Sequence, residues 1–373
     1  MTNATAVVFE GPKTFAIHEL PIPHIEPDEM IVEVVLAGVD GSELHIFDGK
    51  LERINAKAPL VLGDEIIGRV SKIGTEAANT RGLVVGDLVA IEARWPCEEN
   101  CRACAGGNYM ICEHHRRTLM GRHGYASTPL VEAPGLWGGY ATHVFVPKEA
   151  LIAKVPEGLP LNTALYACSV LANGLRWARE AGASEGKTIV VIGPGPQGLA
   201  CVIAASRAGA RVVSVGLERD GARLDATRHA GASEIIAIPS GEKPDETAAR
   251  IGAIVGDVDA VIEVAGPPAA KQLAFAVVSP LGTVVNVSVA SPQVQEIDWM
   301  ALLLKEITIK TPMSHPYTVA PALDLALEMY NDGFDVGQFV THTFGLHEVE
   351  HAIAVAAYRT EETPIKVALD PSR

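Results

Sequence analysis

Basic residues are scarce in this 373-residue sequence, which has 30 lysines and arginines against 45 aspartates and glutamates, for a formal net charge of −15. Binding to nucleic acid or to an anionic membrane uses clusters of lysine and arginine. The sequence carries too few cations for such a surface. We therefore expect the partner to be a small molecule rather than a nucleic acid or a membrane.

Long apolar runs are also missing, and none reaches the roughly 18 residues that a membrane-spanning helix needs. The first residues, MTNATAVVFEGPKTF, lack the basic segment and following apolar segment that mark a secretory signal. Low-complexity tracts are absent as well. Together these features favour a cytoplasmic protein.

Cysteine is sparse outside one short stretch that holds four of the six cysteines: Cys97, Cys101, Cys104 and Cys112. In a reducing compartment such a cluster indicates a metal site before it indicates disulfides. Four thiolates can close tetrahedrally around Zn²⁺ and leave no open coordination position. We therefore predict one structural zinc, in a lobe at about 95–115, and look elsewhere for the chemistry.

The chain is long enough for two domains. Short alternating runs such as MIVEVVLAGV are typical of β strands and occupy the first part of the chain. From Leu161 onward, apolar strands such as TIVVIG alternate with helical segments, which predicts a parallel, doubly wound sheet. The last strand, PIKVAL, has no helix after it, so we expect it to return to the first domain.

A glycine-rich turn follows the strand TIVVIG at the start of a predicted helix. Gly193, Gly195 and Gly198 have the Gly-x-Gly-x-x-Gly spacing of dinucleotide-binding proteins. The first glycine permits a tight turn, the second admits a pyrophosphate, and the third lets the helix and strand pack closely. We predict that this turn, with Pro196 and Gln197, binds a dinucleotide cofactor.

The tip of the next strand should distinguish NAD from NADP, because an acid there accepts the ribose hydroxyls of NAD and excludes a 2′-phosphate. Gly216 occupies the usual position of this acid, which would admit NADP. Glu218 follows shortly after, and Arg219 could serve a phosphate; alternatively, both are solvated turn charges. We expect NAD or NADP, with a slight preference for NAD, and we add Ala265 and Ser288 to the predicted cofactor site.

An all-β first part, a cysteine-rich lobe and a nucleotide-binding second part together resemble the zinc-containing medium-chain dehydrogenases, which include alcohol, sorbitol and threonine dehydrogenases. The resemblance covers essentially the entire chain. It implies an α/β protein with a GroES-like β-barrel catalytic domain and a Rossmann domain, a nicotinamide cleft between them, and a homodimer or homotetramer. The implied segments are 1–160 (catalytic domain), 161–311 (Rossmann domain) and 312–373 (return to the catalytic domain). The segments that carry the resemblance are GVDGSELH (38–45), PLVLGDEIIGRV (59–70), GGYATHVFVP (138–147) and GPGPQGL (193–199).

The sequence departs from this family at the catalytic zinc. The resemblance implies a cysteine ligand in the first segment, where Asp40 stands, and a histidine ligand in the second, where Asp64 stands. The third ligand of the family is a cysteine or glutamate early in the linking helix. Cys168 lies near that position but one residue out of register.

Other parts of the family's site are kept. Ser42 and His45 match its proton relay, and Glu65 matches the acid beside its metal. Trp95, Tyr125 and Trp137 fall where the family lines its substrate cleft. They could pack against a ring of the substrate, although aromatic residues in such loops are more often core residues. Cys168 is assigned to the same pocket.

Two chemical readings of the acids remain open. Without a metal, Asp40, Asp64 and Glu65, with Glu43 nearby, would crowd in a partly dry site, which raises at least one carboxyl pKa above about 4 and provides a general acid or base. With a metal, Asp40, Asp64 and Cys168, with help from Glu65, could bind Zn²⁺, but so many anions would blunt its charge. A decayed zinc site with a structural role only is the third alternative. We expect the metal-free acid–base site.

The resulting hypothesis is reversible hydride transfer between NAD(P) and a secondary alcohol or ketone. Asp40 or Asp64 would handle the proton, helped by Ser42 and His45. One alternative is zinc-independent reduction of an activated C=C bond, and another is a nucleotide-binding relative without catalytic activity. The sequence does not specify the substrate.

Overall fold

The computed structural model describes residues 3–117, 121–122, 124–289 and 294–373. The chain divides into two compact units: unit 1 comprises residues 1–169 and 319–373, and unit 2 comprises residues 170–318. The sequence-based domain limits at 160 and 311 fall before the limits of the structural units, at 169 and 318. The first limit differs because helix α6 (Leu161–Tyr166) belongs to unit 1.

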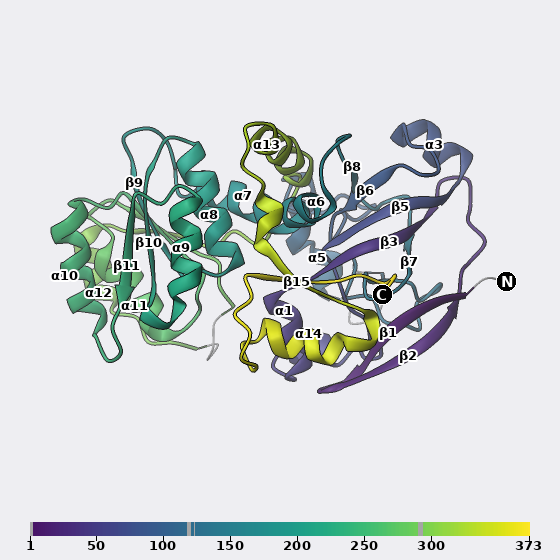
Figure 1. The fold of residues 1–373 in the computed structure, drawn as a ribbon, viewed down its shortest axis with the longest axis horizontal. Coiled ribbons are helices and arrows are strands. Elements are labelled where there is room, and N and C mark those ends of the chain that lie inside the picture. The colour runs from purple at the N-terminus through teal and green to yellow at the C-terminus, as the bar shows by residue number, and fades with distance from the viewer. Residues whose placement is uncertain (1–2, 118–120, 123, 290–293) are drawn as a thin grey trace. The chain divides into compact units, whose positions relative to one another are not determined.

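Unit 1 contains two sheets within the described residues (Figure 1). The larger has the strand order β15-β16-β3-β5-β6-β8, with β7 pairing β3, and the smaller has the order β2-β1-β4. The larger sheet consists of β3 (Met30–Val39), β5 (Ile66–Ile73), β6 (Leu88–Ile91), β7 (His143–Val146), β8 (Ile152–Lys154), β15 (Val340–Phe344) and β16 (Lys366–Leu369). The smaller consists of β1 (Asn3–Gly11), β2 (Thr14–Pro21) and β4 (Leu60–Val61).

Strand β3 is the centre of the larger sheet. Its sequence MIVEVVLAGV is almost continuously apolar, and nearly all of its residues are buried because it pairs with β5, β7 and β16. The pairing with β16 brings the end of the chain against the end of β3, where Val39 precedes Asp40.

The helices of unit 1 are short, apart from one near the C-terminal end. They are α1 (Gly41–Phe47), α2 (Glu52–Asn55), α3 (Thr75–Arg81), α4 (Arg102–Ala105), α5 (Glu113–Arg117), α6, α13 (Val319–Asn331) and α14 (Val349–Ala356). Shorter 3₁₀ turns cover Tyr109–Ile111, Val336–Phe339 and Leu346–Glu348. The single helix expected from Leu161 onward is interrupted by a π-helical turn, Ala167–Leu171, before α7 (Ala172–Glu180) begins.

Unit 2 is built on a parallel sheet with the order β11-β10-β9-β12-β13-β14 within the described residues. This is the doubly wound order of dinucleotide-binding folds, and it confirms the predicted α/β class with a Rossmann-type sheet. The strands are β9 (Thr188–Ile192), β10 (Arg211–Leu217), β11 (Glu234–Ile238), β12 (Ala260–Glu263), β13 (Thr283–Asn286) and β14 (Thr308–Lys310).

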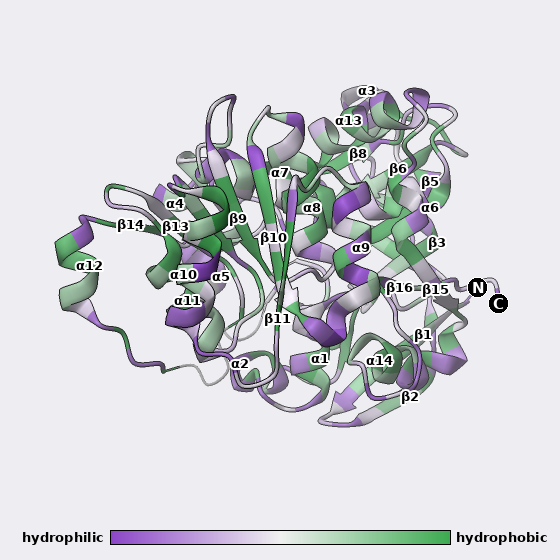
Figure 2. Ribbon diagram, turned by 60° about the vertical axis from the view of Figure 1, so that its left-hand side comes forward, coloured by the Kyte–Doolittle hydropathy of each residue, from purple (hydrophilic) through white to green (hydrophobic). Residues whose placement is uncertain are grey.

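Helices cover the sheet of unit 2 and bury its inner strands. The residues of these strands are mostly apolar, as the green colour of β9 and β10 in Figure 2 shows. The helices are α7, α8 (Pro196–Arg207), α9 (Gly221–His229), α10 (Pro244–Val255), α11 (Pro268–Val277) and α12 (Trp299–Lys305), with a 3₁₀ turn at Glu218–Asp220. Across the described part of the chain, every helix is too short or too polar to cross a membrane.

Candidate functional site

Asp40 lies at the junction of β3 and α1 and is the N-cap of that helix. Its Oδ1 accepts a hydrogen bond from the backbone N–H of Glu43 at 2.9 Å, and Glu43 accepts in return from the backbone N–H of Asp40 at 3.1 Å. This reciprocal capping box satisfies two donors at the helix start. The Ser42 hydroxyl is 2.9 Å and 3.1 Å from the two carboxylate oxygens of Asp40. Asp40 is therefore engaged in holding α1.

Glu43 is fully buried and its two carboxylate oxygens are occupied. Oε1 accepts from the backbone N–H of Gly63 at 2.6 Å, and Oε2 accepts from the Tyr140 hydroxyl at 2.5 Å. Burial, and then the charges of Asp40 and Asp64, raise the pKa of Glu43 well above its usual range. Gly63 has φ of +91°, and a Cβ there would lie 2.7 Å from the Tyr140 ring, so this turn requires glycine.

Asp64 is the acid of this cluster that has no fixed partner. Within the described residues its carboxyl group has neither a hydrogen bond nor an ion pair, and the residue is only partly covered. Burial of the carboxyl group, and then the charges of Asp40 and Glu65, raise the pKa of Asp64 well above its usual range, although the charges of Arg94 and Lys366 oppose the shift. Asp64 is therefore the acid in this cluster best suited to exchange a proton.

Glu65 is balanced by a buried cation. It forms an ion pair with Lys366 of β16, and the two side chains are 1% and 2% exposed. Lys366 also donates to the backbone carbonyl of Val39 at 2.8 Å, beside Asp40. Burial raises the pKa of Glu65, while the charge of Lys366 limits the rise. A Cβ at Gly38 would clash with the Glu65 carboxylate, so glycine at this position makes room for the ion pair.

The acids that could hold a metal differ from the set predicted by the sequence. Single oxygens of Asp40, Glu43 and Asp64 lie within 4.8 Å of one another. However, the oxygens of Glu43 and Asp40 already accept hydrogen bonds from protein donors, which leaves fewer of their lone pairs for a cation. Cys168 lies outside this group: its thiol is 3.3 Å from the Leu165 carbonyl, and burial raises its pKa, which disfavours the thiolate. The residues present fit a catalytic metal poorly.

Ser42 and His45, the residues of the predicted proton relay, both lie on α1. Ser42 and His45 are three residues apart on α1 and so lie on one side of the helix. The Ser42 hydroxyl contacts Asp40, and no hydrogen bond joins it to His45 among the described residues. Burial, and then the charge of Lys50, lower the pKa of His45, which favours its neutral imidazole.

The three aromatic residues predicted to line a substrate pocket pack in the hydrophobic core of unit 1 instead. Trp95, Tyr125 and Trp137 are at most 4% exposed. The ring of Trp95 lies 5.4 Å from that of Tyr125 and 6.2 Å from that of Trp137, within the range of favourable aromatic contacts. The assignment to a substrate pocket is corrected accordingly, because burial leaves these rings no open face. Cys168, which was assigned to the same pocket, is also buried, at 1% exposed.

The cysteine lobe has the geometry of a structural zinc site. The sulfurs of Cys97, Cys101, Cys104 and Cys112 all lie within 4.8 Å of one another. The Cys97–Cys104 and Cys101–Cys112 sulfur distances are 3.8 Å and 3.9 Å, close to the roughly 3.8 Å expected for a tetrahedron with Zn–S bonds of about 2.3 Å. Backbone N–H groups of Cys104 and Glu113 lower the pKa of Cys101 to about 6, which favours a thiolate ligand, whereas burial raises the pKa of Cys104 and Cys112. These four residues fit a bound zinc ion.

The glycine-rich turn in unit 2 fits a dinucleotide. A Cβ at Gly195, the N-cap of α8, would project into open space, where a pyrophosphate could approach the helix N-terminus. A Cβ at Gly198 would clash with the carbonyl of Gly193, so the third glycine permits the close helix–strand packing. Pro196 occupies the first turn of α8, and the side-chain oxygen of Gln197 is buried there without a hydrogen-bond partner among the described residues.

Glycine, rather than an acid, stands at the tip of β10 because a side chain there would clash with a neighbouring residue. A Cβ at Gly216 would lie 2.7 Å from the ring of Pro194, which follows the first glycine of the turn. Glu218 and Arg219 are exposed beyond it. Asp220, which sequence reasoning missed, is 8% exposed and accepts from the backbone N–H of Leu217 at 3.0 Å, closing the turn.

Ala265 and Ser288 follow β12 and β13. Ala265 is exposed, and a Cβ at Gly193 would meet its Cβ at 3.0 Å, so this loop packs on the first glycine of the cofactor turn. Ser288 donates to the buried carboxylate of Glu263 at 2.5 Å. Both predicted residues therefore lie at the carboxyl ends of parallel strands, the edge where such sheets bind ligands.

The sequence analysis does not predict that Tyr140 and Lys366 contact the acid cluster, and it names Glu43 only as an acid close to the cluster. The lysine inside the apolar strand PIKVAL indicates an ion pair, because a buried lysine in a strand needs an acidic partner. The spacing of Asp40 and Glu43 also matches a capping box, which the sequence could have revealed.

Each of the two units contains residues that match a known protein family. A family model of the alcohol dehydrogenase GroES-like domain matches residues 26–157, and one of the zinc-binding dehydrogenases matches residues 196–328. The chain is 28% identical to a sorbitol dehydrogenase of Bombyx mori over 95% of its length and 96% of the relative. It is 33% identical to a probable alcohol dehydrogenase of Mycobacterium tuberculosis over 75% of its length and 74% of the relative.

A solved structure, an alcohol dehydrogenase of Thermotoga maritima, superposes with a TM-score of 0.84 at 25% identity, and the match covers 99% of both chains. The predicted combination of a GroES-like domain and a Rossmann-type domain is therefore confirmed.

Proposed function

Because the chain belongs to the zinc-containing medium-chain dehydrogenase family and is an oxidoreductase of that type, we propose that it transfers hydride reversibly between a nicotinamide dinucleotide and a secondary alcohol or its ketone. Its similarity to a sorbitol dehydrogenase favours a hydroxyl group on a small polyol or alcohol as the substrate. The burial of Trp95, Tyr125 and Trp137 removes the reason to expect a bulky ring.

The single observation that carries the proposal is the state of Asp64. Its carboxyl group has a raised pKa and no partner in the described residues, whereas Asp40 caps α1 and Glu65 is paired with Lys366. A carboxyl whose pKa approaches the working pH can both accept and return a proton. We assign the acid–base role to Asp64 rather than to Asp40.

In the direction of alcohol oxidation, the O–H proton of the substrate moves to the Asp64 carboxylate as the C–H bond breaks and the C=O bond forms. A nicotinamide bound at the glycine-rich turn would supply the acceptor for the hydrogen and two electrons of the C–H bond. In ketone reduction, protonated Asp64 returns its proton to the carbonyl oxygen, so no further reactant is needed.

The neighbours of Asp64 support this role. The negative charges of Asp40 and Glu65 favour the protonated form of Asp64, whereas the positive charges of Arg94 and Lys366 favour its carboxylate form. Tyr140 and Gly63 hold Glu43, which anchors the turn that precedes Asp64. No step of the proposed reaction uses a catalytic metal, and zinc is assigned to Cys97, Cys101, Cys104 and Cys112 only.

We assign NAD as the cofactor in preference to NADP. The exposed carboxylate of Glu218 at the tip of β10 would repel a 2′-phosphate, although the adjacent Arg219 would offset part of this repulsion. The proposed cofactor site combines Gly193, Gly195 and Gly198 with the loops that carry Ala265 and Ser288.

We also propose that the protein self-associates as a homodimer or homotetramer through unit 2. Strand β14 is an edge of the sheet among the described residues, and α12 exposes Trp299, Leu303 and Leu304 by 67%, 67% and 77%. Exposed apolar side chains next to a sheet edge are typical of protein interfaces. We propose a cytoplasmic location, where thiols stay reduced, and none of the six cysteines, all within the described residues, forms a disulfide.

A substrate panel tests the proposed function. For oxidation, purified protein is mixed with NAD or NADP and with sorbitol, smaller polyols or simple secondary alcohols. For reduction, it is mixed with NADH or NADPH and an enone. Nicotinamide absorbance is followed in both assays. The proposal expects reduction of NAD by at least one secondary alcohol, with NADP less effective. Turnover of the enone alone would contradict it in favour of C=C reduction, and cofactor binding without any turnover would contradict an enzymatic role.

A further inference from the structure

A buried ion pair in unit 2 lies outside the predicted cofactor site but touches both of its loops. Glu263, the last residue of β12, is fully buried, and Lys271 of α11 has a side chain that is only 11% exposed. Their charged atoms are 2.7 Å apart. Burying two charges costs several kcal/mol per ion before their attraction is counted, so such a pair needs further hydrogen bonds to be stable.

Glu263 fixes the loop after β12. Its Oε1 accepts from the backbone N–H groups of Ala265 and Gly266, both at 2.7 Å. The conformation of this loop also depends on Gly266, which has φ of +101° and would place a Cβ 2.8 Å from the Val289 carbonyl. The carboxylate therefore determines where the backbone of Ala265 lies.

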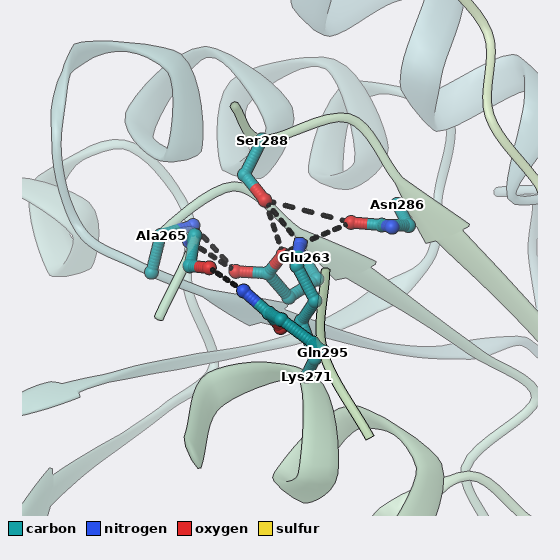
Figure 3. A network of polar contacts seen from close by, with 7 residues as sticks. Glu263, Ala265, Lys271, Asn286, Ser288 and Gln295 are labelled. Atoms are coloured by element: carbon teal, nitrogen blue, oxygen red, sulfur yellow. Dashed lines mark hydrogen bonds and ion pairs between the residues drawn. The ribbon is translucent and has the colours of Figure 1, made fainter. Parts of the chain in front are cut away.

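Lys271 extends the same network to the end of β13. Its ammonium group donates to Glu263, to the side-chain oxygen of Asn286 and to the Ser288 hydroxyl, each at 2.7 Å (Figure 3). Ser288 in turn donates to Glu263 at 2.5 Å. An ammonium has three N–H donors, and here each has a partner, so the lysine is held in one position.

The network thus joins the loops that follow two neighbouring parallel strands. Parallel sheets of this order bind dinucleotides at the carboxyl ends of their strands. The first of these loops also contacts the glycine-rich turn, because a Cβ at Gly193 would lie 3.0 Å from that of Ala265 and 3.1 Å from its backbone nitrogen. Displacement of Ala265 would therefore reach the turn that is proposed to hold the pyrophosphate.

We propose that Lys271 is a positioning residue for the dinucleotide, which acts through Glu263, Asn286 and Ser288 to hold the loops after β12 and β13 in the binding conformation. The inference rests on the proposed function, because it presupposes that unit 2 binds a nicotinamide dinucleotide. Lys271 itself need not touch the cofactor.

Lys305 provides a matched control within the same unit. Its ammonium group also makes three hydrogen bonds, to the carbonyls of Phe275, Ala276 and Val278 at 3.1, 2.7 and 2.9 Å. It caps the C-terminal end of α11, whereas Lys271 lies near the start of that helix. Loss of either lysine should destabilise unit 2, but only loss of Lys271 should disturb the cofactor loops.

The test compares Lys271→Met and Lys305→Met in the full chain by titration with NADH and, separately, NADPH, followed through nicotinamide fluorescence, together with thermal unfolding. We expect Lys271→Met to raise the Kd of the preferred cofactor by about tenfold and Lys305→Met to change it by less than about twofold. Asn286→Ala removes one acceptor of Lys271 and keeps the ion pair of Lys271 with Glu263. This milder variant replaces Lys271→Met in the test if Lys271→Met does not fold. We expect it to raise the Kd by about threefold.

Unchanged Kd values in Lys271→Met, or in Asn286→Ala where the first variant does not fold, would overturn the inference while leaving the proposed function intact. An equal loss of affinity in Lys305→Met would also overturn it, because the effect would then reflect stability alone. Failure of the wild-type chain to bind either nucleotide would overturn the proposed function and this inference together.

Discussion

Lys366, near the C-terminal end of the chain, forms a buried ion pair with Glu65, which lies just before β5. The pair leaves the adjacent Asp64 as an acid without a hydrogen bond or ion pair of its own in the described residues. One acid of the cluster is thus neutralised by a lysine, one caps a helix, one is fixed by Gly63 and Tyr140, and one is free. This division of roles, rather than the number of acids, selects Asp64 for proton transfer.

The first prediction concerns Asp64 itself. Asp64→Asn keeps the size of the side chain but cannot exchange the proton, so we expect turnover to fall by about 100-fold or more, as for the loss of a general acid or base. The Kd of the nicotinamide cofactor should not change. Steady-state rates and fluorescence titration measure the two effects.

Asp87→Asn is the control for this variant, because Asp87 pairs with the exposed Lys154 at 2.7 Å in the same unit. It should keep wild-type turnover. Full activity in Asp64→Asn would remove this residue from the mechanism.

The second prediction concerns the dependence of stability on pH. The pKa values of Asp64, Glu43 and Glu65 are raised in the folded chain, chiefly by burial. The folded state then binds these protons more tightly than the unfolded state, so their contribution to the free energy of unfolding falls as pH rises from the unfolded value of about 4 through the raised folded values.

Asp64→Asn removes one of these titrating groups. We expect the variant to unfold at a higher temperature than the wild type at about pH 8 and to show a smaller decline between about pH 5 and 8. Thermal unfolding at several pH values measures both. A steeper decline in Asp64→Asn than in the wild type would show that the carboxyl group is not held in a destabilising environment.

The third prediction concerns Lys366. Lys366→Met leaves the Glu65 carboxylate buried without its cation, and removal of one partner of such a pair costs about 3–5 kcal/mol. Lys154→Met, which breaks the pair between the exposed ammonium of Lys154 and Asp87, should cost less than about 1 kcal/mol. Urea unfolding of the two variants gives the comparison. Equal, small losses would mean that the ion pair does not support the fold.

The fourth prediction concerns the cysteine lobe. Cys104→Ser removes one of four ligands of a closed site, so we expect the purified protein to lose its zinc and to unfold at a lower temperature, since metal binding at such sites is coupled to folding. Cys201 is buried in α8, outside the lobe, so the Cys201→Ala variant should retain zinc at the wild-type level. Zinc retained at the wild-type level in Cys104→Ser would argue that the metal is bound elsewhere.

Those parts of the fold that depend on neighbouring residues were predictable from the sequence. The glycine spacing from Gly193 to Gly198 predicted the tight turn at the start of α8, and the clustered cysteines predicted a lobe that brings their sulfurs together, because each motif is set by local geometry. The parallel order of unit 2 followed from the alternation of apolar strands and helices.

Features that depend on contacts between distant segments were not predictable in the same way. Lys366 reaches Glu65 only because β16 pairs with β3, and Gly216 lacks a side chain because Pro194 packs against it. The three rings assigned to a pocket became core because their loops fold inward. The sequence located Asp40 and Asp64 together, but the difference between a capped acid and a free one emerged only from their hydrogen bonds.

We propose that an aspartate, and not a second metal ion, handles the proton. Elemental analysis of the purified, active wild-type protein is a direct test, because it counts zinc per chain without knowledge of the substrate. We expect about one zinc per chain, bound by Cys97, Cys101, Cys104 and Cys112, as for a closed structural site. About two zinc ions per chain, with the second lost in Asp64→Asn, would show that a metal occupies the acid cluster.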